Sequence, residues 1–373
     1  MKNKKVLFII HRIYFNDQPK LGGVDRIIDF LKKNNETTTI EHPFEKINHP
    51  SVFTSKVKKL THNSVLKPPL IWFEEFVFNV YWILKNKNVY DLAVASDPLN
   101  YFSCLILKLL KKVNKTQFHS TDYSPKRFNN LLLDIFYHFL YNLSVKNADI
   151  ITVTSTRMHK VVQEKLDKVN IHKVFLLPNS PYFSFIPKTN INKKNPLDLV
   201  MLIGRWGDQI NTENIINGLK LLKKDYPNIR LNIIGHTDNS YIKLFKENKL
   251  DKNIILYGSL PYDKAMEKMS NCYIGITSYS ETNSYVHFAD SLKIREYAAA
   301  GLPTVCDSVY GTSEEVIDYE SGDVYNTSLE MYEKIKKLIK DFKLYKEKSD
   351  NAIKWAQRMD KQKLLNNLYE KYD

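Results

Sequence analysis

Short β-rich runs alternate with longer helical patterns along the whole chain, and this alternation is the feature that most restricts the fold. Most of the runs are continuous apolar or β-branched stretches, which is the pattern of a strand covered on both faces. Strands that alternate with helices form βαβ units, and these units build a parallel sheet between two layers of helices. In the first half we expect strands at 6–11, 37–42, 91–96, 116–119, 149–155 and 174–178.

The alternation is interrupted once. Residues 181–197 contain three prolines and show no periodicity, which is typical of a linker. After this segment the pattern restarts, with strands expected at 197–204, 230–235, 254–258, 273–278 and 303–307. A length of 373 residues also favours two domains. We therefore predict an α/β protein with a Rossmann-like domain at 1–185, a second at 196–345, and C-terminal helices at 346–373 that could cross back to the first domain.

The net positive charge of the chain lies almost entirely in its first half. The net charge is +14, and counting residues 1–190 alone gives 28 basic and 15 acidic side chains. Such asymmetry points to a polyanionic partner, either a nucleic acid or an anionic membrane surface. Three lysines at 56–59 precede an aromatic run at 71–82, and aromatic residues flanked by lysine suit the headgroup region of a bilayer. A buried core helix with a solvated basic face is the alternative interpretation.

The apolar stretches and the cysteines exclude other classes of protein. The most apolar stretch, 68–84, contains two glutamates and an asparagine, whereas a spanning helix needs about 20 residues with almost no charge. We therefore expect no membrane-spanning helix. Cys104, Cys272 and Cys306 lie far apart, as expected for reduced thiols of a cytosolic protein, and no residues show the spacing of a metal site.

Two segments have the composition of phosphate-binding sites. Gly22 and Gly23 lie between the first strand and its helix, where the backbone can approach a ligand and the helix N-terminus favours an anion. Arg205 ends a buried strand, at the edge where ligands of open α/β sheets bind. A simple tight turn and a surface salt bridge are the respective alternatives.

The segment from Asp290 to Pro303, DSLKIREYAAAGLP, is the most informative. Lys293 and Glu296 are three residues apart and share one face of a helix, which Gly301 then ends. A glutamate facing inward can accept both hydroxyl groups of a ribose, and the lysine can neutralise phosphate. An ordinary surface ion pair is the alternative.

These segments, in the order GGVDRI, ADIITVTS, LLPNS, VMLIGR, LNIIGH, ILYGSLPYDKAMEKMSNCYIGITS and DSLKIREYAAAGLPTV, resemble glycosyltransferase family 4. The resemblance covers nearly the whole chain and is clearest from 149 to about 316. It implies the GT-B fold, in which two Rossmann-like domains face each other across a cleft and the C-terminal domain holds most of the nucleotide-sugar donor. It also implies retention at the anomeric carbon, no metal requirement, and no cofactor, because the nucleotide sugar is a co-substrate.

The resemblance assigns roles to individual residues of the donor site. Glu296 would hold the donor ribose, and Arg205 would bind the diphosphate. The remaining donor residues are the glycines that cap the diphosphate, a lysine near the phosphates, and the loop that contacts the base: Gly22, Gly23, Lys293, Tyr257, Ser259 and Leu260.

The sequence departs from the family pattern at two positions. The first glutamate of the Glu–seven residues–Glu motif is replaced by Phe288, and neither Glu281 nor Asp290 has the right spacing to substitute for it. In addition, Ile210 stands where the family often has a lysine, so that Lys293 could supply the charge. These changes bear on how the transferred sugar is held.

On the acceptor side, His119 and Asp122 follow a strand directly and are the candidate catalytic residues. The resemblance implies that His119 contacts the transferred sugar. Asp122 could orient or deprotonate an acceptor hydroxyl, or it could only cap a turn. In retaining members of the family the leaving phosphate is thought to take this proton, so that no protein base is needed.

We therefore expect a hexosyltransferase of polysaccharide biosynthesis, acting on a lipid-linked or cell-surface glycan, cytoplasmic and bound peripherally to the inner face of an anionic membrane through its N-terminal half. A nucleotide-sugar epimerase of similar fold is the first alternative. A basic nucleic-acid-binding protein is the second, although no recognition module appears in the sequence, so we expect no nucleic-acid partner.

Overall fold

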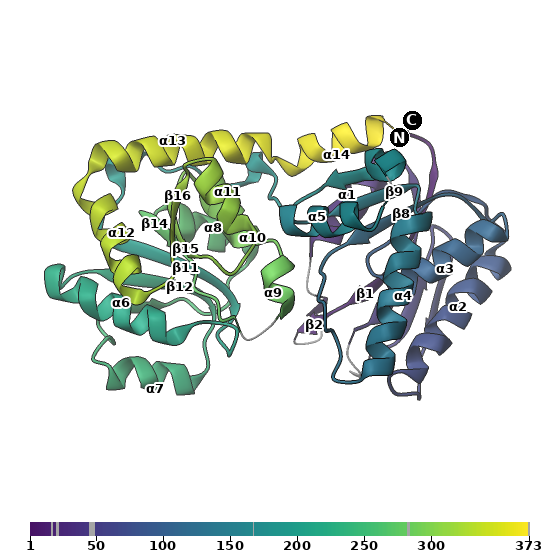
Figure 1. Cartoon of the computed structure of the whole chain (residues 1–373), viewed down its shortest axis with the longest axis horizontal. Coiled ribbons are helices and arrows are strands. Elements are labelled where there is room, and N and C mark those ends of the chain that lie inside the picture. The colour runs from purple at the N-terminus through teal and green to yellow at the C-terminus, as the bar shows by residue number, and fades with distance from the viewer. Residues whose placement is uncertain (16–17, 20–21, 45–48, 167, 282–283, 372–373) are drawn as a thin grey trace. The chain divides into compact units, whose positions relative to one another are not determined.

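A computed structural model describes residues 1–15, 18–19, 22–44, 49–166, 168–281 and 284–371. The chain divides into two compact units. Unit 1 comprises Met1–Pro178 and Leu364–Asp373, and unit 2 comprises Asn179–Lys363. Figure 1 labels the helices and many of the strands of both units. The predicted linker, residues 181–197, thus belongs to unit 2, where Ile186 is buried in the core.

Unit 1 is built on an eight-stranded sheet, counted over the described residues, in the order β10-β9-β8-β7-β1-β4-β5-β6. The strands from β10 to β4 are parallel, as predicted, but β5 and β6 add an antiparallel edge that the sequence did not indicate. The strands are β1 (Lys5–Arg12), β4 (Glu36–Pro43), β5 (Ser51–Thr54), β6 (Lys59–His62), β7 (Tyr90–Ala95), β8 (Val113–Ser120), β9 (Ile150–Val153) and β10 (Val174–Leu176), and a small separate pair is formed by β2 (Tyr14–Phe15) and β3 (Gln18–Pro19).

Helices cover both faces of this sheet. The crossovers from β1 to β4 and from β7 to β8 run in opposite directions along the sheet, and right-handed crossovers then place their helices on opposite faces. Val6, Phe8 and Ile10 pack with α1 and α14 on one face. On the other face α3 lies between α2 and α4 (Figure 1). The helices are α1 (Gly23–Lys32), α2 (Leu70–Asn86), α3 (Pro98–Leu109), α4 (Leu131–Asn147), α5 (Thr156–Glu164) and α14 (Lys361–Glu370), with a 3-10 helix at Lys168–Lys173.

Unit 2 is built on an all-parallel sheet in the order β13-β12-β11-β14-β15-β16. Alternate residues of β11 enter different cores, because side chains alternate between the faces of a strand. Met201 packs in one core with residues of α6 and α12, and Leu202 packs in the other with residues of α8, α10 and α13. The strands are β11 (Asp198–Arg205), β12 (Arg230–His236), β13 (Ile254–Leu256), β14 (Ile274–Ile276), β15 (Thr304–Asp307) and β16 (Gly322–Tyr325).

The helices of unit 2 explain the apolar patterns around the linker and in the final third of the chain. They are α6 (Thr212–Asp225), α7 (Asn239–Glu247), α8 (Tyr262–Ser270), α9 (Ser284–Phe288), α10 (Leu292–Ala299), α11 (Thr312–Asp318), α12 (Ser328–Lys340) and α13 (Phe342–Arg358), with 3-10 helices at Phe183–Phe185 and Ile191–Lys193. The start of the predicted linker contacts the last residues of this unit, since the Phe183 N–H donates to the carboxylate of Asp360 at 2.9 Å. Each of the two units thus has its own core on both faces of a Rossmann-like sheet, which confirms the predicted fold class.

Candidate functional site

The carboxyl ends of the parallel strands of unit 2 lie at one edge of the sheet, where open α/β sheets bind ligands. At this edge Glu296 lies on α10 and is only 3% exposed. The hydroxyl of Tyr262, the first residue of α8, donates to its Oε1 at 2.8 Å. Tyr262 itself is 46% exposed, so this pair extends from the core to the surface. The sequence did not single out Tyr262, although its place directly after a strand-end loop was a signal.

The loop after β13 contains the three residues predicted to contact a base. Tyr257 is half-buried, and its hydroxyl donates to the side chain of Asn232 at 3.3 Å. Ser259 is exposed, and Leu260 packs against the core of the unit. The loop leads directly into α8, and therefore the Tyr262–Glu296 hydrogen bond brings the predicted base-contacting loop and the predicted ribose-binding residue to the same place.

Lys293 has a partner other than the one expected for a surface ion pair. Its Nζ donates to the hydroxyl of Tyr279 at 3.0 Å and lies 5.5 Å from the centre of the same ring. Tyr279 is 5% exposed, and burial raises its pKa above the ordinary value for tyrosine. The ammonium group is therefore held at the start of α10 by a neutral hydroxyl.

The other predicted phosphate ligands are placed as follows. Arg205 ends β11, and its side chain lies outside the described part of the chain. Gly22 and Gly23 begin α1 in unit 1, with Gly22 as the N-cap residue. The N–H of Gly22 donates to the carboxylate of Asp25 at 2.5 Å, and this carboxylate also pairs with buried Arg12. The helix N-terminus thus carries an acceptor from its own first turn.

Of the two positions that depart from the family pattern, Ile210 is buried in the core of unit 2, and the residues around the missing first glutamate are placed as follows. Phe288 is half-buried at the end of α9, and Glu281 is exposed. Asp290 is buried, and its carboxylate accepts hydrogen bonds from Arg295 at 2.8 Å. Arg295 also donates to Glu315 at 2.6 Å. Asp290 is therefore committed to a buried ion network, which holds the first turn of α10.

The predicted acceptor-side residues lie at the carboxyl end of β8. His119 is 0% exposed, and its Nδ1 lies 2.9 Å from the Thr152 hydroxyl on the neighbouring strand. Asp122 is partly exposed and accepts from Arg127 at 2.9 Å. The structure thus places His119 inside the sheet layer and Asp122 at the surface beyond it.

A second group of titratable residues at this edge was missed by the sequence analysis. His11 at the end of β1 lies between two carboxylates, with Nδ1 2.9 Å from Asp97 and Nε2 3.2 Å from Glu75. Burial alone would lower the pKa of His11, but the charge of Asp97 and the hydrogen bonds with both carboxylates outweigh it and raise the pKa to about 10. Asp97 also accepts from the side chain of Asn100 at 2.7 Å. The three groups are far apart in the sequence, and only the fold brings them together.

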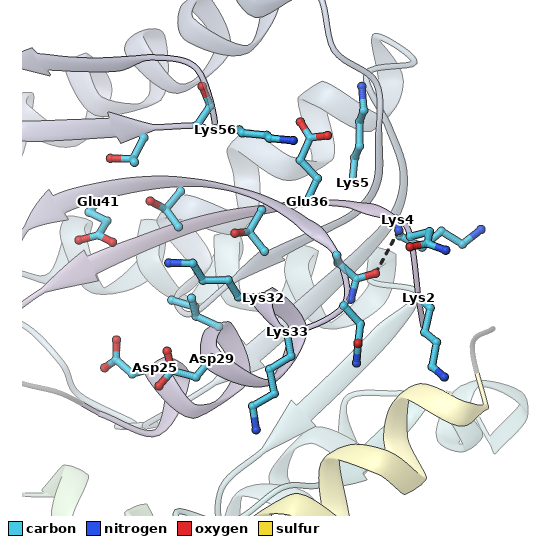
Figure 2. A pocket seen from close by; sticks show the side chains of 18 of the residues that line it. Lys2, Lys4, Lys5, Asp25, Asp29, Lys32, Lys33, Glu36, Glu41 and Lys56 are labelled. Carbon is cyan, nitrogen blue, oxygen red and sulfur yellow. Dashed lines mark hydrogen bonds between the residues drawn. The ribbon is translucent and has the colours of Figure 1, made fainter.

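A polar groove of about 1120 Å³ lies along α1 and β4 of unit 1 (Figure 2). Asp25, Asp29 and Glu41 lie toward one end of it, and Lys4 and Lys5 lie toward the other. Lys4 and Lys5 lie at the amino end of β1, so part of the positive charge of the N-terminal half is at the opposite edge of the sheet from Asp97.

Neither a metal site nor a spanning segment emerges from the described residues. Among them, no group of three or more His, Cys, Asp or Glu side chains could hold a metal ion. None of the helices found there is long and apolar enough to cross a membrane.

Comparisons with known proteins agree with this architecture. Residues 184–355, all within unit 2, match the family model of the group 1 glycosyl transferases. No curated protein sequence matches the chain. Among solved structures, sucrose-phosphate synthase from Thermosynechococcus elongatus is similar, with a TM-score of 0.74 and 13% identity over 99% of this chain and 98% of that chain.

Two further structures extend the similarity. HepE from Anabaena in complex with UDP has a TM-score of 0.71 and 15% identity over 99% of both chains. WaaG, a glycosyltransferase involved in lipopolysaccharide biosynthesis, has a TM-score of 0.68 and 14% identity over 97% of this chain and 98% of that chain. At these identities the likeness shows the fold, which is that of the GT-B enzymes.

Proposed function

Because residues 184–355 match the family model of the group 1 glycosyl transferases, we propose that the chain transfers a hexose from a uridine diphosphate sugar to a lipid-linked or cell-surface glycan. The observation that carries this proposal is the Glu296–Tyr262 pair at the carboxyl edge of the unit 2 sheet. A carboxylate has about four acceptor sites on its two oxygens, so it can bind a ribose hydroxyl in addition to a hydroxyl of the protein. The complex of HepE with UDP supports uracil as the base.

Two basic residues of unit 2 are suited to the leaving diphosphate. Lys293 lies three residues before Glu296 on α10, and Arg205 lies at the end of β11. We assign both to the diphosphate, and we keep a phosphate-binding role for Gly22 and Gly23 at the start of α1 as a separate proposal. Cations and backbone N–H groups that are fixed before the reaction stabilise the charge that develops on the leaving group. A metal ion is not needed for this role, and we propose a metal-independent reaction with retention at the anomeric carbon.

For the acceptor side we propose different roles for the two predicted residues. His119 is fully buried and hydrogen-bonded to Thr152, which suits a residue that positions the end of β8. Asp122 is partly exposed, so its carboxylate, which pairs with Arg127 at 2.9 Å, can orient an acceptor hydroxyl. The His11–Asp97 pair at the ends of β1 and β7 is a second polar group at the same edge.

The membrane part of the proposal rests on an apolar surface of unit 1, which we call the α2–α4 surface. Its members are large apolar or aromatic side chains of α2 and α4 that are 42% to 76% exposed: Leu70, Phe73, Val77, Tyr81, Leu84, Leu131, Leu132, Ile135, Phe136 and Phe139. Monomeric soluble proteins rarely expose contiguous apolar patches of this kind, and such patches mark interaction sites.

Positive charge lies beside this surface. Lys85 donates to the Tyr81 hydroxyl at 3.0 Å, and this hydrogen bond, together with the nearby charge of Lys58, lowers the pKa of Tyr81. Lys126 lies at the other end, near the first turn of α4. Burial alone would raise the pKa of Asp134 there, but hydrogen bonds from the N–H groups of Phe128 and Arg127 lower it, and the charges of His138 and Lys126 add to this lowering. Apolar and aromatic side chains bordered by lysine fit an anionic bilayer, so we propose peripheral binding to the inner face of the membrane.

Substitution of Glu296 tests the donor site. We expect Glu296→Ala to abolish sugar transfer and to remove the increase in melting temperature that UDP causes, because a ligand stabilises only the state that binds it. Glu267→Gln on α8 is the matched control, since Glu267 is an exposed glutamate paired with Lys264. Full transfer activity in Glu296→Ala, with UDP still stabilising the protein, would refute the assignment.

A further inference from the structure

An apolar groove of about 260 Å³ opens within the α2–α4 surface. It is lined by side chains of the segment before α2 and of three helices: Pro69, Trp72, Phe73, Phe76, Leu99, Phe102, Phe136 and Leu140. Figure 1 shows α2, α3 and α4 as neighbouring helices of unit 1. The volume is slightly below the range of about 300–1,000 Å³ that is usual for drug-sized ligands, so the groove is too small for a nucleotide sugar.

The chemistry of the lining favours hydrocarbon. Every lining side chain is aliphatic or aromatic, and the indole of Trp72 brings the one polar hydrogen among them. The rings of Phe76 and Phe102 lie 5.1 Å apart, and those of Trp72 and Phe128 lie 5.6 Å apart. Apolar cavities without polar partners do not hold water well but bind apolar molecules.

The groove lies next to the acceptor-side edge of the sheet. Leu99, in its lining, follows Asp97 by two residues, so their Cα atoms are at most about 7.6 Å apart. Phe76, also in the lining, directly follows Glu75 on α2. Asp97 and Glu75 are the carboxylates that hold His11. The head group of a lipid whose hydrocarbon chain binds in the groove would therefore lie near these polar residues.

We propose that the groove binds one hydrocarbon chain of a lipid acceptor and thereby presents the hydroxyl-bearing head of that lipid to the Asp97–His11 edge. The inference rests on the proposed function and narrows it, because it selects a membrane lipid over a soluble glycan as the acceptor. The lysines beside the surface favour an anionic lipid over a second copy of this apolar surface. Two copies packed face to face would bring Lys58, Lys85 and Lys126 close to the same lysines of the other copy, and like charges repel.

The protein carries its own reporter for this site. Of the four tryptophans, Trp72 lines the groove and is partly exposed, whereas Trp82, Trp206 and Trp355 are at most 5% exposed. Bromine atoms quench tryptophan fluorescence only at close range. We expect 9,10-dibromostearate, below its micelle concentration, to quench the tryptophan fluorescence of the full chain until the site is saturated. The Trp72→Phe variant should not show this saturable quenching. Stearate should compete with the quencher.

A pair of variants on α4 separates the groove from the surrounding surface. Phe136 lines the groove, whereas Phe139 is exposed on the same helix outside it. We expect Phe136→Asp to raise the half-quenching concentration at least tenfold and Phe139→Asp to change it less than twofold. Equal effects of the two variants, or quenching that does not saturate, would overturn the proposal.

The failure of this inference can be told apart from failure of the proposed function. Stabilisation by UDP reports the donor site of unit 2, and it should persist in Phe136→Asp. If UDP stabilises the protein but dibromostearate never quenches Trp72, the groove assignment is wrong and the glycosyltransferase assignment stands. Sedimentation equilibrium of the wild type shows whether a second copy covers the surface instead, and a dimer that Phe136→Asp dissociates would likewise overturn the lipid proposal.

Discussion

Phe139→Ser gives the sharpest test of membrane binding by the α2–α4 surface. Phe139 is 60% exposed, and complete burial of a phenylalanine side chain is worth roughly 1.5–3 kcal/mol. Moving the exposed part of the ring out of water is therefore worth about 1–2 kcal/mol. Since 1.4 kcal/mol corresponds to tenfold in affinity, we expect the variant to bind vesicles about 5- to 30-fold more weakly. Co-sedimentation with vesicles of 30% phosphatidylglycerol in phosphatidylcholine measures this change.

Two controls make the result specific. Phe342→Ser removes a phenylalanine of similar exposure, 50%, from unit 2, and it should not change vesicle binding. Lys85→Gln should weaken binding about fivefold at low salt, because a lysine near an anionic leaflet contributes about 1 kcal/mol. At 1 M salt the Debye length falls to about 3 Å, so the effect of Lys85→Gln should vanish while that of Phe139→Ser remains. Wild-type vesicle binding by Phe139→Ser would refute the reasoning.

Two further predictions concern the buried ion networks. Arg295→Met leaves Asp290 and Glu315 without their shared cation, and we expect it to lower the free energy of unfolding, measured in urea, by about 3–5 kcal/mol. The control is Arg230→Met, which removes an exposed pair with Asp198 and should cost at most about 1 kcal/mol. The folded-state pKa of His11, about 10, lies above its unfolded value near 6.5, so the stability that His11 contributes is complete below about pH 6.5 and is lost as the pH rises toward 10. The unfolding midpoint should therefore fall between pH 7 and 9 in the wild type and show a smaller slope in His11→Gln.

The parts of the fold that could be predicted are those in which the residues of one short segment already show whether that segment is buried. Val6 to Ile10 form an unbroken apolar run because helices cover both faces of β1, and this run alone predicts a central parallel strand. The edge hairpin of β5 and β6 gave no such signal. Its strands are only four residues long, and β6 alternates between exposed and half-buried positions.

The candidate site divides in the same way. Glu296 was predicted because its motif is local, within one helix and the turn that follows. Tyr262 is 34 residues away in the sequence, and the link appears only when α8 and α10 pack together. His11 and Asp97 are 86 residues apart and meet because β1 and β7 are neighbours in the sheet. Contacts of this kind depend on strand order, which no single segment encodes.

The exposure of the apolar face of α2 follows from what the opposite face of that helix holds. Glu75 and Asn79 point inward, where Glu75 is hydrogen-bonded to His11 at 3.2 Å and Asn79 is hydrogen-bonded to His42 at 2.8 Å. Rolling the helix to bury its outer face would break both contacts, at about 1–3 kcal/mol for each buried polar group left unpaired, and would expose the buried ring of Trp82. The helix therefore cannot relieve its exposed apolar stripe by turning. Only a cover from outside unit 1 can remove that stripe from water, and we propose that an anionic bilayer provides this cover.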